Sequence, residues 1–159
     1  MRRLLPLALA PAALAAVLAG CGGGSHSATT ASGYTATTPA KTTTVKAART
    51  KLGTVLVDGQ GRTLYLFERD KGRASTCYGA CASAWPPVTG GATAAGLPAA
   101  KLASTKRTDG KAGVTYGGHP LYTYAGDAKP GDVQGQGLDQ FGAEWYAVAP
   151  SGRKIDDDS

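Results

Sequence analysis

Apolar and polar side chains alternate over short stretches of the chain, which is the pattern of β-strands. In the run Leu64–Phe67 this alternation places two leucines on one face and two aromatic rings on the other, so we expect an inner strand with both faces buried. The runs 52–58 and 62–67 flank the turn Gly59-Gln60-Gly61, and this arrangement predicts a β-hairpin.

A second hairpin is expected further along the chain. The runs 112–116 and 119–124 flank Gly117-Gly118, and two adjacent glycines suit the tight hairpin turns that need positive φ. A further strand is expected at 144–149, whereas 92–103 should hold one short helical turn at most. No long helical pattern occurs, so the pattern predicts an all-β fold.

One ten-residue stretch occurs twice. Residues 61–70 align with residues 118–127 at an offset of 57, with Gly, Leu, Tyr, an aromatic residue and Asp at the same spacing, and each copy is followed by a tryptophan. The repeated positions are Tyr65, Phe67, Asp70 and Trp85 in the first copy and Tyr122, Tyr124, Asp127 and Trp145 in the second. Because repetition sets architecture, we expect a sandwich or small barrel in which a duplicated antiparallel β unit is arranged about a pseudo-two-fold axis.

The repeated positions resemble the motif of a known family. Tyr65-Leu-Phe67-Glu-Arg-Asp70 and Tyr122-Thr-Tyr124-Ala-Gly-Asp127 match the Tyr-x-(Phe/Trp/Tyr)-x-x-Asp pattern of the exported, often lipid-anchored secreted-repeat proteins. The flanking segments Cys77–Cys81, Trp85-Pro86-Pro87 and Gly135-Gln136-Gly137 are similar too. The resemblance implies an exported protein, but it implies no activity because the family is defined by its pattern.

The motif residues allow a structural and a functional interpretation. In the structural one, the aspartate ends a strand and accepts N–H groups of the following turn, while the tyrosine is a buried ring with a bonded hydroxyl. In the functional one, the rings line a shallow surface for a sugar, a peptide or a wall polymer. Duplication favours the structural interpretation, because fold determinants must repeat whereas catalytic residues need not.

The N-terminus has the layout of an export signal. Met1-Arg2-Arg3 precedes an uncharged stretch rich in Leu, Ala and Val that runs to Gly20, and this order of segments is typical of a secretory signal. Leu18-Ala19-Gly20-Cys21 resembles the lipobox of bacterial lipoproteins. This resemblance implies that Cys21 carries the lipid and becomes the first residue of the mature protein. An ordinary signal peptide with a coincidental cysteine is the alternative.

Composition divides the chain into four expected parts. These are a lipoprotein signal peptide at 1–20, a lipidated N-terminus with a disordered Thr/Gly/Ser-rich tether at 21–48, a β domain at 49–155 and an acidic tail at 156–159. The β domain should hold two repeats, about 50–100 and 101–155. The formal net charge is +6, but residues 52–159 hold eleven Lys or Arg and eleven Asp or Glu, so the domain is neutral. We therefore expect no nucleic-acid partner.

The cysteines allow two interpretations. With Cys21 lipidated, Cys77 and Cys81 remain, and an exported compartment permits a disulfide between them. The alternative is redox chemistry or copper(I) binding by this pair with His119, because soft thiolates suit copper(I). His119 aligns with Arg62 of the first copy, so the repeat does not require a histidine there and we expect an exposed turn residue.

The sequence has no motif that combines a nucleophile, a general base and a residue that orients the base. It also has no nucleotide-binding glycine loop at the start of a helix, so we expect no enzyme. We expect a non-enzymatic binding or structural module without a cofactor. It should be lipid-anchored on the extracytoplasmic face of the membrane in a bacterial envelope, with an unknown envelope protein or wall polymer as its partner. The alternative is a redox or copper(I)-handling accessory protein that uses Cys77 and Cys81.

Overall fold

The computed structural model describes residues 41–156, and within them short strands dominate. The strands are β1 Thr42–Thr50, β2 Gly53–Val57, β3 Tyr65–Phe67, β4 Gly91–Ala95, β5 Leu102–Lys106, β6 Ala112–Tyr116, β7 His119–Pro120, β8 Leu138–Gln140 and β9 Ala143–Ala147. The helical elements are α1, Ala80–Ala84, and the 3-10 turn η1, Ala99–Lys101. No helix in this part of the chain is long and apolar enough to cross a membrane. The all-β expectation is confirmed.

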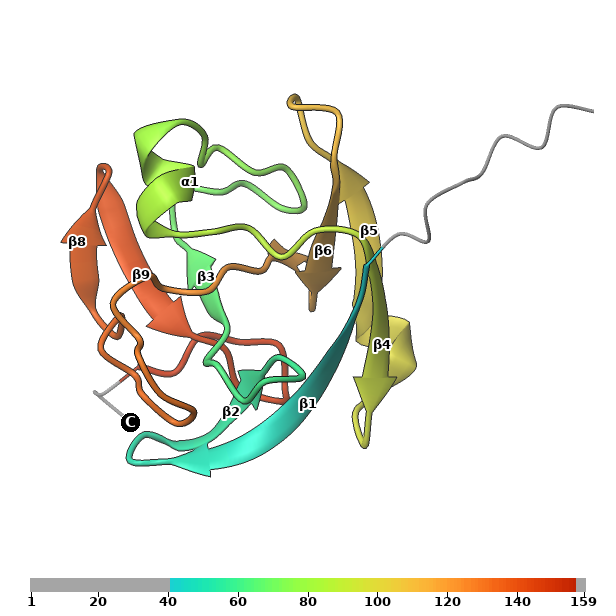
Figure 1. Cartoon of the computed structure of the whole chain (residues 1–159), viewed down its shortest axis with the longest axis vertical. Coiled ribbons are helices and arrows are strands. Elements are labelled where there is room, and N and C mark those ends of the chain that lie inside the picture. Colours follow the sequence, from blue (N-terminus) through green and yellow to red (C-terminus); the bar gives the residue numbers. More distant parts are fainter. Residues whose placement is uncertain (1–40, 157–159) are drawn as a thin grey trace, which may run out of the picture. The chain divides into compact units, whose positions relative to one another are not determined.

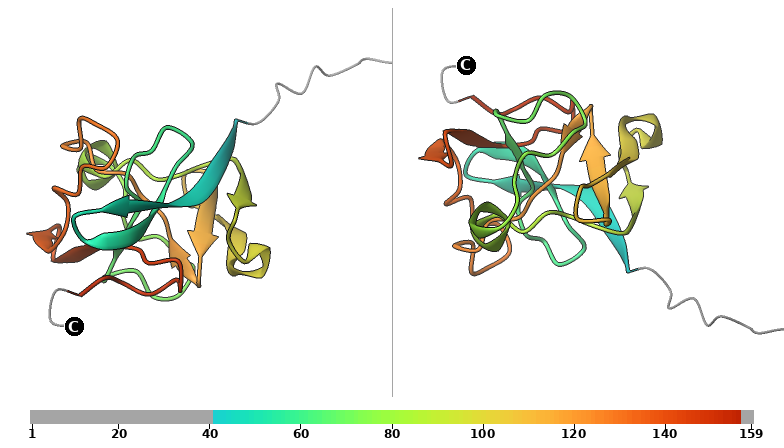
Figure 2. Two further views of the ribbon diagram at one scale, coloured as in Figure 1. Left: turned by 90° about the horizontal axis from the view of Figure 1, so that it is seen from below. Right: turned by 90° about the horizontal axis from the view of Figure 1, so that it is seen from above.

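Residues 41–156 form three small sheets, with strand orders β2-β1-β4, β3-β9-β8 and β5-β6-β7. β1 serves two partners along its length, as Figure 1 and the two views of Figure 2 show. Residues 42–46 pair with β4 in parallel, and residues 46–50 pair with β2 antiparallel. Two of the sheets, β2-β1-β4 and β5-β6-β7, therefore each lie within one half of the chain, whereas the third joins β3 of the first half to β9 and β8 of the second.

The two repeats meet at an antiparallel bridge between Tyr65 and Tyr122. Each of these residues donates its N–H to the carbonyl of the other, at 2.8 and 3.0 Å. The bonds around the bridge also come in matched pairs: Val88 N–H donates to the carbonyl of Leu121 at 2.8 Å, and Val148 N–H donates to that of Leu64 at 3.0 Å. The backbone therefore follows the expected pseudo-two-fold symmetry.

Both predicted hairpins form. Gly117 and Gly118 have φ of 59° and 93°, and β6 pairs with β7 across them. At the first turn, Asp58 N–H donates to the carbonyl of Arg62 at 2.9 Å, and Leu64 N–H donates to that of Leu56 at 2.9 Å. In both hairpins the second strand then continues to other partners, since β3 pairs with β9 and Tyr122 bridges to Tyr65.

The alternation in β3 separates two hydrophobic cores, as predicted. Leu64 and Leu66 belong to one cluster, while Tyr65 and Phe67 belong to the other, which also holds both tryptophans and the disulfide. Every strand and both clusters lie within residues 42–155. This segment therefore has what it needs to fold by itself, because folding stability comes mainly from such buried apolar clusters.

The predicted tether and domain boundaries are wrong for residues 42–48. These residues belong to β1, and Val45 is fully buried in the first core cluster. A Thr-rich stretch can form a strand because β-branched residues suit the pleated backbone and because only one face needs to be buried. The predicted signal peptide, Cys21, the tether up to residue 40 and residues 157–159 lie outside the described residues.

Candidate functional site

The repeated tyrosines and aspartates bond across the two repeats. Tyr65 Oη donates to Asp127 Oδ2 at 2.7 Å, and Tyr122 Oη donates to Asp70 Oδ2 at 2.6 Å. The second carboxylate oxygen accepts an N–H of the turn that follows: Thr76 for Asp70 at 2.7 Å, and Gln134 for Asp127 at 2.9 Å. Each aspartate therefore caps its own turn, as expected, and also holds the tyrosine of the other repeat.

Burial shapes the ionisation of these groups. Both tyrosines are fully buried, and Asp127 is 8% exposed. Burial, reinforced by the neighbouring carboxylate, raises the pKa of Tyr65 and of Tyr122 well above the usual value. Burial also raises the pKa of Asp127. A phenol with a raised pKa beside a bonded carboxylate is a structural donor, because neither group is free to exchange a proton with a ligand.

The repeated aromatic residues form one continuous stack across the axis. Trp85 and Trp145 lie parallel, with ring centroids 3.9 Å apart, and neither is exposed. Phe67 extends the stack from Trp145 at 4.0 Å, and Tyr124 extends it from Trp85 at 4.3 Å. Tyr65 meets the edge of Trp85 in the same way as Tyr122 meets Trp145. These rings fill the core, so they do not line a shallow binding surface.

Cys77 and Cys81 are joined by a disulfide, as predicted, and Cys81 lies in α1. Next to them is a buried arginine that the sequence analysis missed. Arg107 is 3% exposed and donates to the carbonyl of Cys77 at 2.9 Å and to Ser75 Oγ at 2.7 Å. Its place in the polar run Lys106-Arg107-Thr108-Asp109-Gly110-Lys111, which has the composition of an exposed turn, gave no sign of burial.

The copper alternative gains no support from residues 41–156. The two sulfurs are bonded to each other, so neither is a thiolate ligand. His119 is a half-buried residue of β7, not the exposed turn residue expected. No group of three His, Cys, Asp or Glu side chains in the described part could hold a metal ion. The three candidate copper ligands are therefore not brought together.

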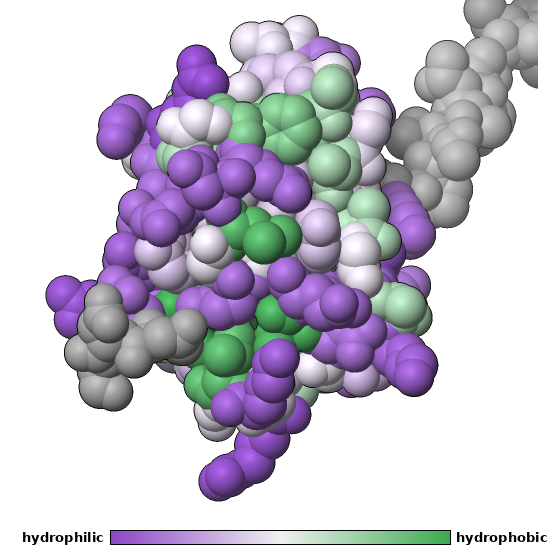
Figure 3. All heavy atoms as spheres, turned by 90° about the vertical axis from the view of Figure 1, so that its left-hand side faces the viewer, coloured by the Kyte–Doolittle hydropathy of each residue, from purple (hydrophilic) through white to green (hydrophobic). Residues whose placement is uncertain are grey.

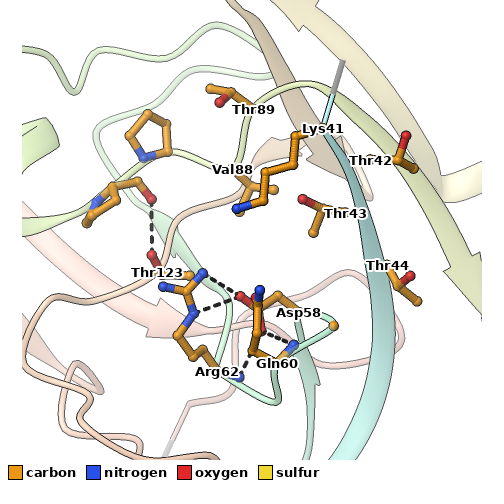
Figure 4. Close-up of a pocket in the computed structure, with 13 residues that line it drawn as sticks. Lys41, Thr42, Thr43, Thr44, Asp58, Gln60, Arg62, Val88, Thr89 and Thr123 are labelled. Carbon is orange, nitrogen blue, oxygen red and sulfur yellow. Dashed lines mark hydrogen bonds and ion pairs between the residues drawn. The ribbon is translucent and has the colours of Figure 1, made fainter. Parts of the chain in front are cut away.

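A polar cleft of about 240 Å³ lies between the start of β1, the turn after β2 and the segment that follows Trp85 (Figure 4). The side chains of Lys41 and Arg62 reach into it from different elements, and Gln60 stands beside Arg62. The rest of the lining consists of Pro86, Pro87, Val88, Thr42, Thr43, Thr44, Thr89 and Thr123. The side chain of Thr43 lies on the cleft side of β1, whereas those of Thr42 and Thr44 lie on the other side of the strand (Figure 4). The cleft therefore offers the Thr43 hydroxyl, an amide and two cations.

The net charge of the cleft depends on the ion pair between Arg62 and the buried Asp58. Asp58 is 2% exposed, and its Oδ1 accepts the N–H groups of Gln60 and Arg62 at 2.9 and 3.0 Å. Its Oδ2 accepts from the Arg62 guanidinium at 2.7 and 2.8 Å. Among the residues described, none forms an ion pair with Lys41. The carboxylate and guanidinium balance each other, which leaves Lys41 as the excess positive charge.

Comparison with known proteins gives one match. A lipoprotein family model, described as a secreted repeat of unknown function, matches the chain twice, at residues 46–89 and 103–149. No curated protein and no solved structure shows a significant match. The two matches coincide with the two halves that meet at the Tyr65–Tyr122 bridge.

Proposed function

Because the chain belongs to the family of secreted repeats of unknown function, we propose that it is a non-enzymatic binding module of the cell envelope, held at the extracytoplasmic face of the membrane by a lipid on Cys21. The membership indicates an extracytoplasmic location. The Cys77–Cys81 disulfide supports the same location, since such bonds persist mainly in oxidising compartments.

The polar cleft is the observation that carries this proposal. The motif residues belong to the core, where the Tyr65 and Tyr122 hydroxyls bond the two carboxylates and the rings stack on one another. In the cleft, by contrast, the Lys41 ammonium and the Gln60 amide reach open space. Ligand sites are concave and hold a few convergent polar groups, and this cleft has that character.

The lining of the cleft defines the class of ligand. Hydroxyl groups donate and accept hydrogen bonds, so they suit the hydroxyls of a sugar or a polyol. The excess positive charge of Lys41 suits a carboxylate or a phosphate. We therefore assign the cleft to an anionic, hydroxyl-rich polymer of the envelope.

Three polymers test the need for negative charge and the need for hydroxyl groups separately. Affinity electrophoresis of residues 37–159 should show retardation by polygalacturonate, which is anionic and hydroxylated. Dextran lacks the charge and polyglutamate lacks the hydroxyls, so both should retard the domain far less. Equal retardation by polyglutamate would show that charge alone drives the binding, and it would contradict the proposed ligand class.

Two variants locate the binding. Lys41→Gln removes the excess charge and should weaken polygalacturonate binding about tenfold, because a charge-assisted hydrogen bond contributes about 1.5–3 kcal/mol. Lys51→Gln, in the exposed turn between β1 and β2, is the matched control and should bind like the wild type. Equal losses in the two variants would show that binding does not occur in the cleft. The anchor is tested separately, by mass spectrometry of the mature protein and of its Cys21→Ser variant.

A further inference from the structure

One aromatic side chain is held outward in an unusual backbone conformation. Phe141 is 41% exposed and is the sole large hydrophobic residue exposed within the described range. It has φ of 60° and, with Gly142 at φ of 88°, forms the turn between β8 and β9. This region of φ is unfavourable for a residue with a Cβ, and Asn, Asp or Gly is usual at such turns. The preference of the turn therefore does not account for a phenylalanine here.

Neighbouring groups hold this turn in place. Arg69 Nη1 donates to the carbonyl of Phe141 at 3.0 Å. A hollow of about 350 Å³, bordered by Tyr78 and Cys81, lies beside the Phe141 ring. The ring therefore stands clear of α1 rather than folding back onto it.

Two other loops join the same end of the domain. Tyr78 Oη accepts the N–H of Thr108 at 3.1 Å, and Arg107 links the loops through Ser75 and Cys77. We call residues 69–78, 104–111 and 140–142 together the Phe141 end. In Figure 1 it is the upper end of the domain, opposite the turn between β1 and β2.

The Phe141 end concentrates positive charge in a domain that is neutral as a whole. Its exposed cations are Arg69, Lys71, Arg73, Lys106 and Lys111. Its two acids are already engaged: Asp70 is buried against Tyr122, and Asp109 pairs with Arg107 at 3.1 Å. Asp139 and Glu144 form the ladder pair next to the turn, Glu144 accepts a hydrogen bond from Tyr146, and Glu68 pairs with Lys154. The residues of the Phe141 end itself therefore hold an excess of cations.

We propose that the Phe141 end docks on an anionic membrane surface, with the Phe141 ring inserted among the headgroups and the five cations facing lipid phosphates. An exposed aromatic ring at the same end of a domain as several Lys and Arg side chains is the composition of interfacial membrane contacts. Figure 3 looks onto the side with α1, β8 and β9, where apolar groups surface between hydrophilic ones. Charge complementarity selects an anionic lipid, since the apolar area alone is small. The docking needs no anchor at Cys21.

Vesicle flotation of residues 37–159, which lack the lipid, tests this docking. The domain should float with vesicles of equal parts phosphatidylglycerol and phosphatidylcholine, and should not float with phosphatidylcholine alone. Replacing Lys71 and Arg73 by Gln should weaken binding about 25-fold, since each cation near such a surface contributes about fivefold. Phe141→Asn should weaken binding about tenfold, because the buried ring is lost.

Matched variants keep the result interpretable. Asn suits positive φ, so Phe141→Asn should melt at or above the wild-type temperature, and lost binding then cannot come from unfolding. Phe141→Leu should retain most of the binding, while Lys51→Gln should leave it unchanged. Undiminished flotation of Phe141→Asn would overturn the proposal. So would a loss of flotation in Lys41→Gln alone, because the polar cleft would then be the lipid site.

Discussion

The exchange of hydrogen bonds between the two repeats predicts how stability depends on two hydroxyl groups. Tyr65→Phe removes the donor 2.7 Å from Asp127 and the acceptor of the Gly135 N–H at 3.3 Å. Asp127 is 8% exposed, so water cannot fully replace the lost donor. A hydrogen bond to a charged group contributes about 1.5–3 kcal/mol. We expect the free energy of unfolding to fall by about 2–3 kcal/mol, a large share of the stability of a domain of this size.

Symmetry makes the same prediction for the other repeat. Tyr122→Phe removes bonds to Asp70 at 2.6 Å and to Ser75 Oγ at 2.7 Å, and its cost should also be about 2–3 kcal/mol. Urea unfolding followed by the fluorescence of the two buried tryptophans measures both variants, with the slope checked for constancy. In a cycle with Asp127→Asn, the double variant with Tyr65→Phe should cost less than the sum of the single ones, because both changes break the same bond.

Tyr124→Phe is the matched control for both variants. The hydroxyl of Tyr124 has no hydrogen-bond partner among residues 41–156, and the equivalent position in the first repeat is already Phe67. Its cost should stay within about 0.5 kcal/mol. The reasoning would be refuted if Tyr65→Phe and Tyr122→Phe were no more costly than this control.

Three further predictions concern pH, the disulfide and one glycine. Burial raises the pKa of Tyr65 and of Tyr122, so above pH 10 the folded state holds protons that the unfolded state releases. The stability that depends on these two groups should be fully present below about pH 10 and fall by up to about 2.7 kcal/mol per unit above it, measured by urea unfolding at each pH with Tyr124→Phe as the matched control. Replacing Cys77 and Cys81 by Ser should cost about 2 kcal/mol, from the closure of a ring of about five residues. The wild-type pair is buried and should have a reduction potential below about −300 mV; a value near −200 mV would favour the redox alternative. Gly135→Ala should cost about 1–3 kcal/mol in the same unfolding assay, because the added Cβ would lie 2.7 Å from the Trp85 ring.

The elements that the sequence predicted are those with a local signal. Alternation in Leu64–Phe67 identified a strand with two buried faces, and Gly117-Gly118 identified the second hairpin. The missed strands are β4, β5, β8 and most of β1, which was assigned to the tether. β4 and the first half of β1 pair with each other in parallel, and these partners lie more than 40 residues apart in the chain. Local propensity cannot reveal a strand whose stability comes from tertiary pairing. β5 and β8 lie close in the chain to their partners β6 and β9, so sequence distance does not explain why they were missed.

In the candidate site, too, contacts between residues close in the chain were predicted and contacts between the two repeats were not. The sequence predicted that Asp70 and Asp127 cap their own turns, because that role depends on nearby residues. It did not predict that each aspartate also holds the tyrosine of the other repeat, because that contact follows from the symmetry of the assembled fold. The cleft was missed for a further reason: Lys41 was assigned to the tether, and the threonines that line the walls form no motif.

The pseudo-two-fold symmetry also indicates where binding should be sought. The fold places Arg62 and Thr123 in the cleft, and their equivalents in the other repeat, His119 and Leu66, line a separate hollow of about 280 Å³. The two places share their position in the fold but not their chemistry, since Arg62 pairs with Asp58 whereas its equivalent is His119, and Leu66 is apolar where Thr123 is polar. A requirement of the fold alone would apply to both repeats alike, so the difference between them favours a ligand of the first cleft. Thr123 does not test this, because it is 5% exposed and its hydroxyl donates to the carbonyl of Pro86 at 3.4 Å. Thr43→Val, which removes a hydroxyl on the cleft side of β1 at nearly constant volume, should weaken polygalacturonate binding, while His119→Gln leaves it unchanged.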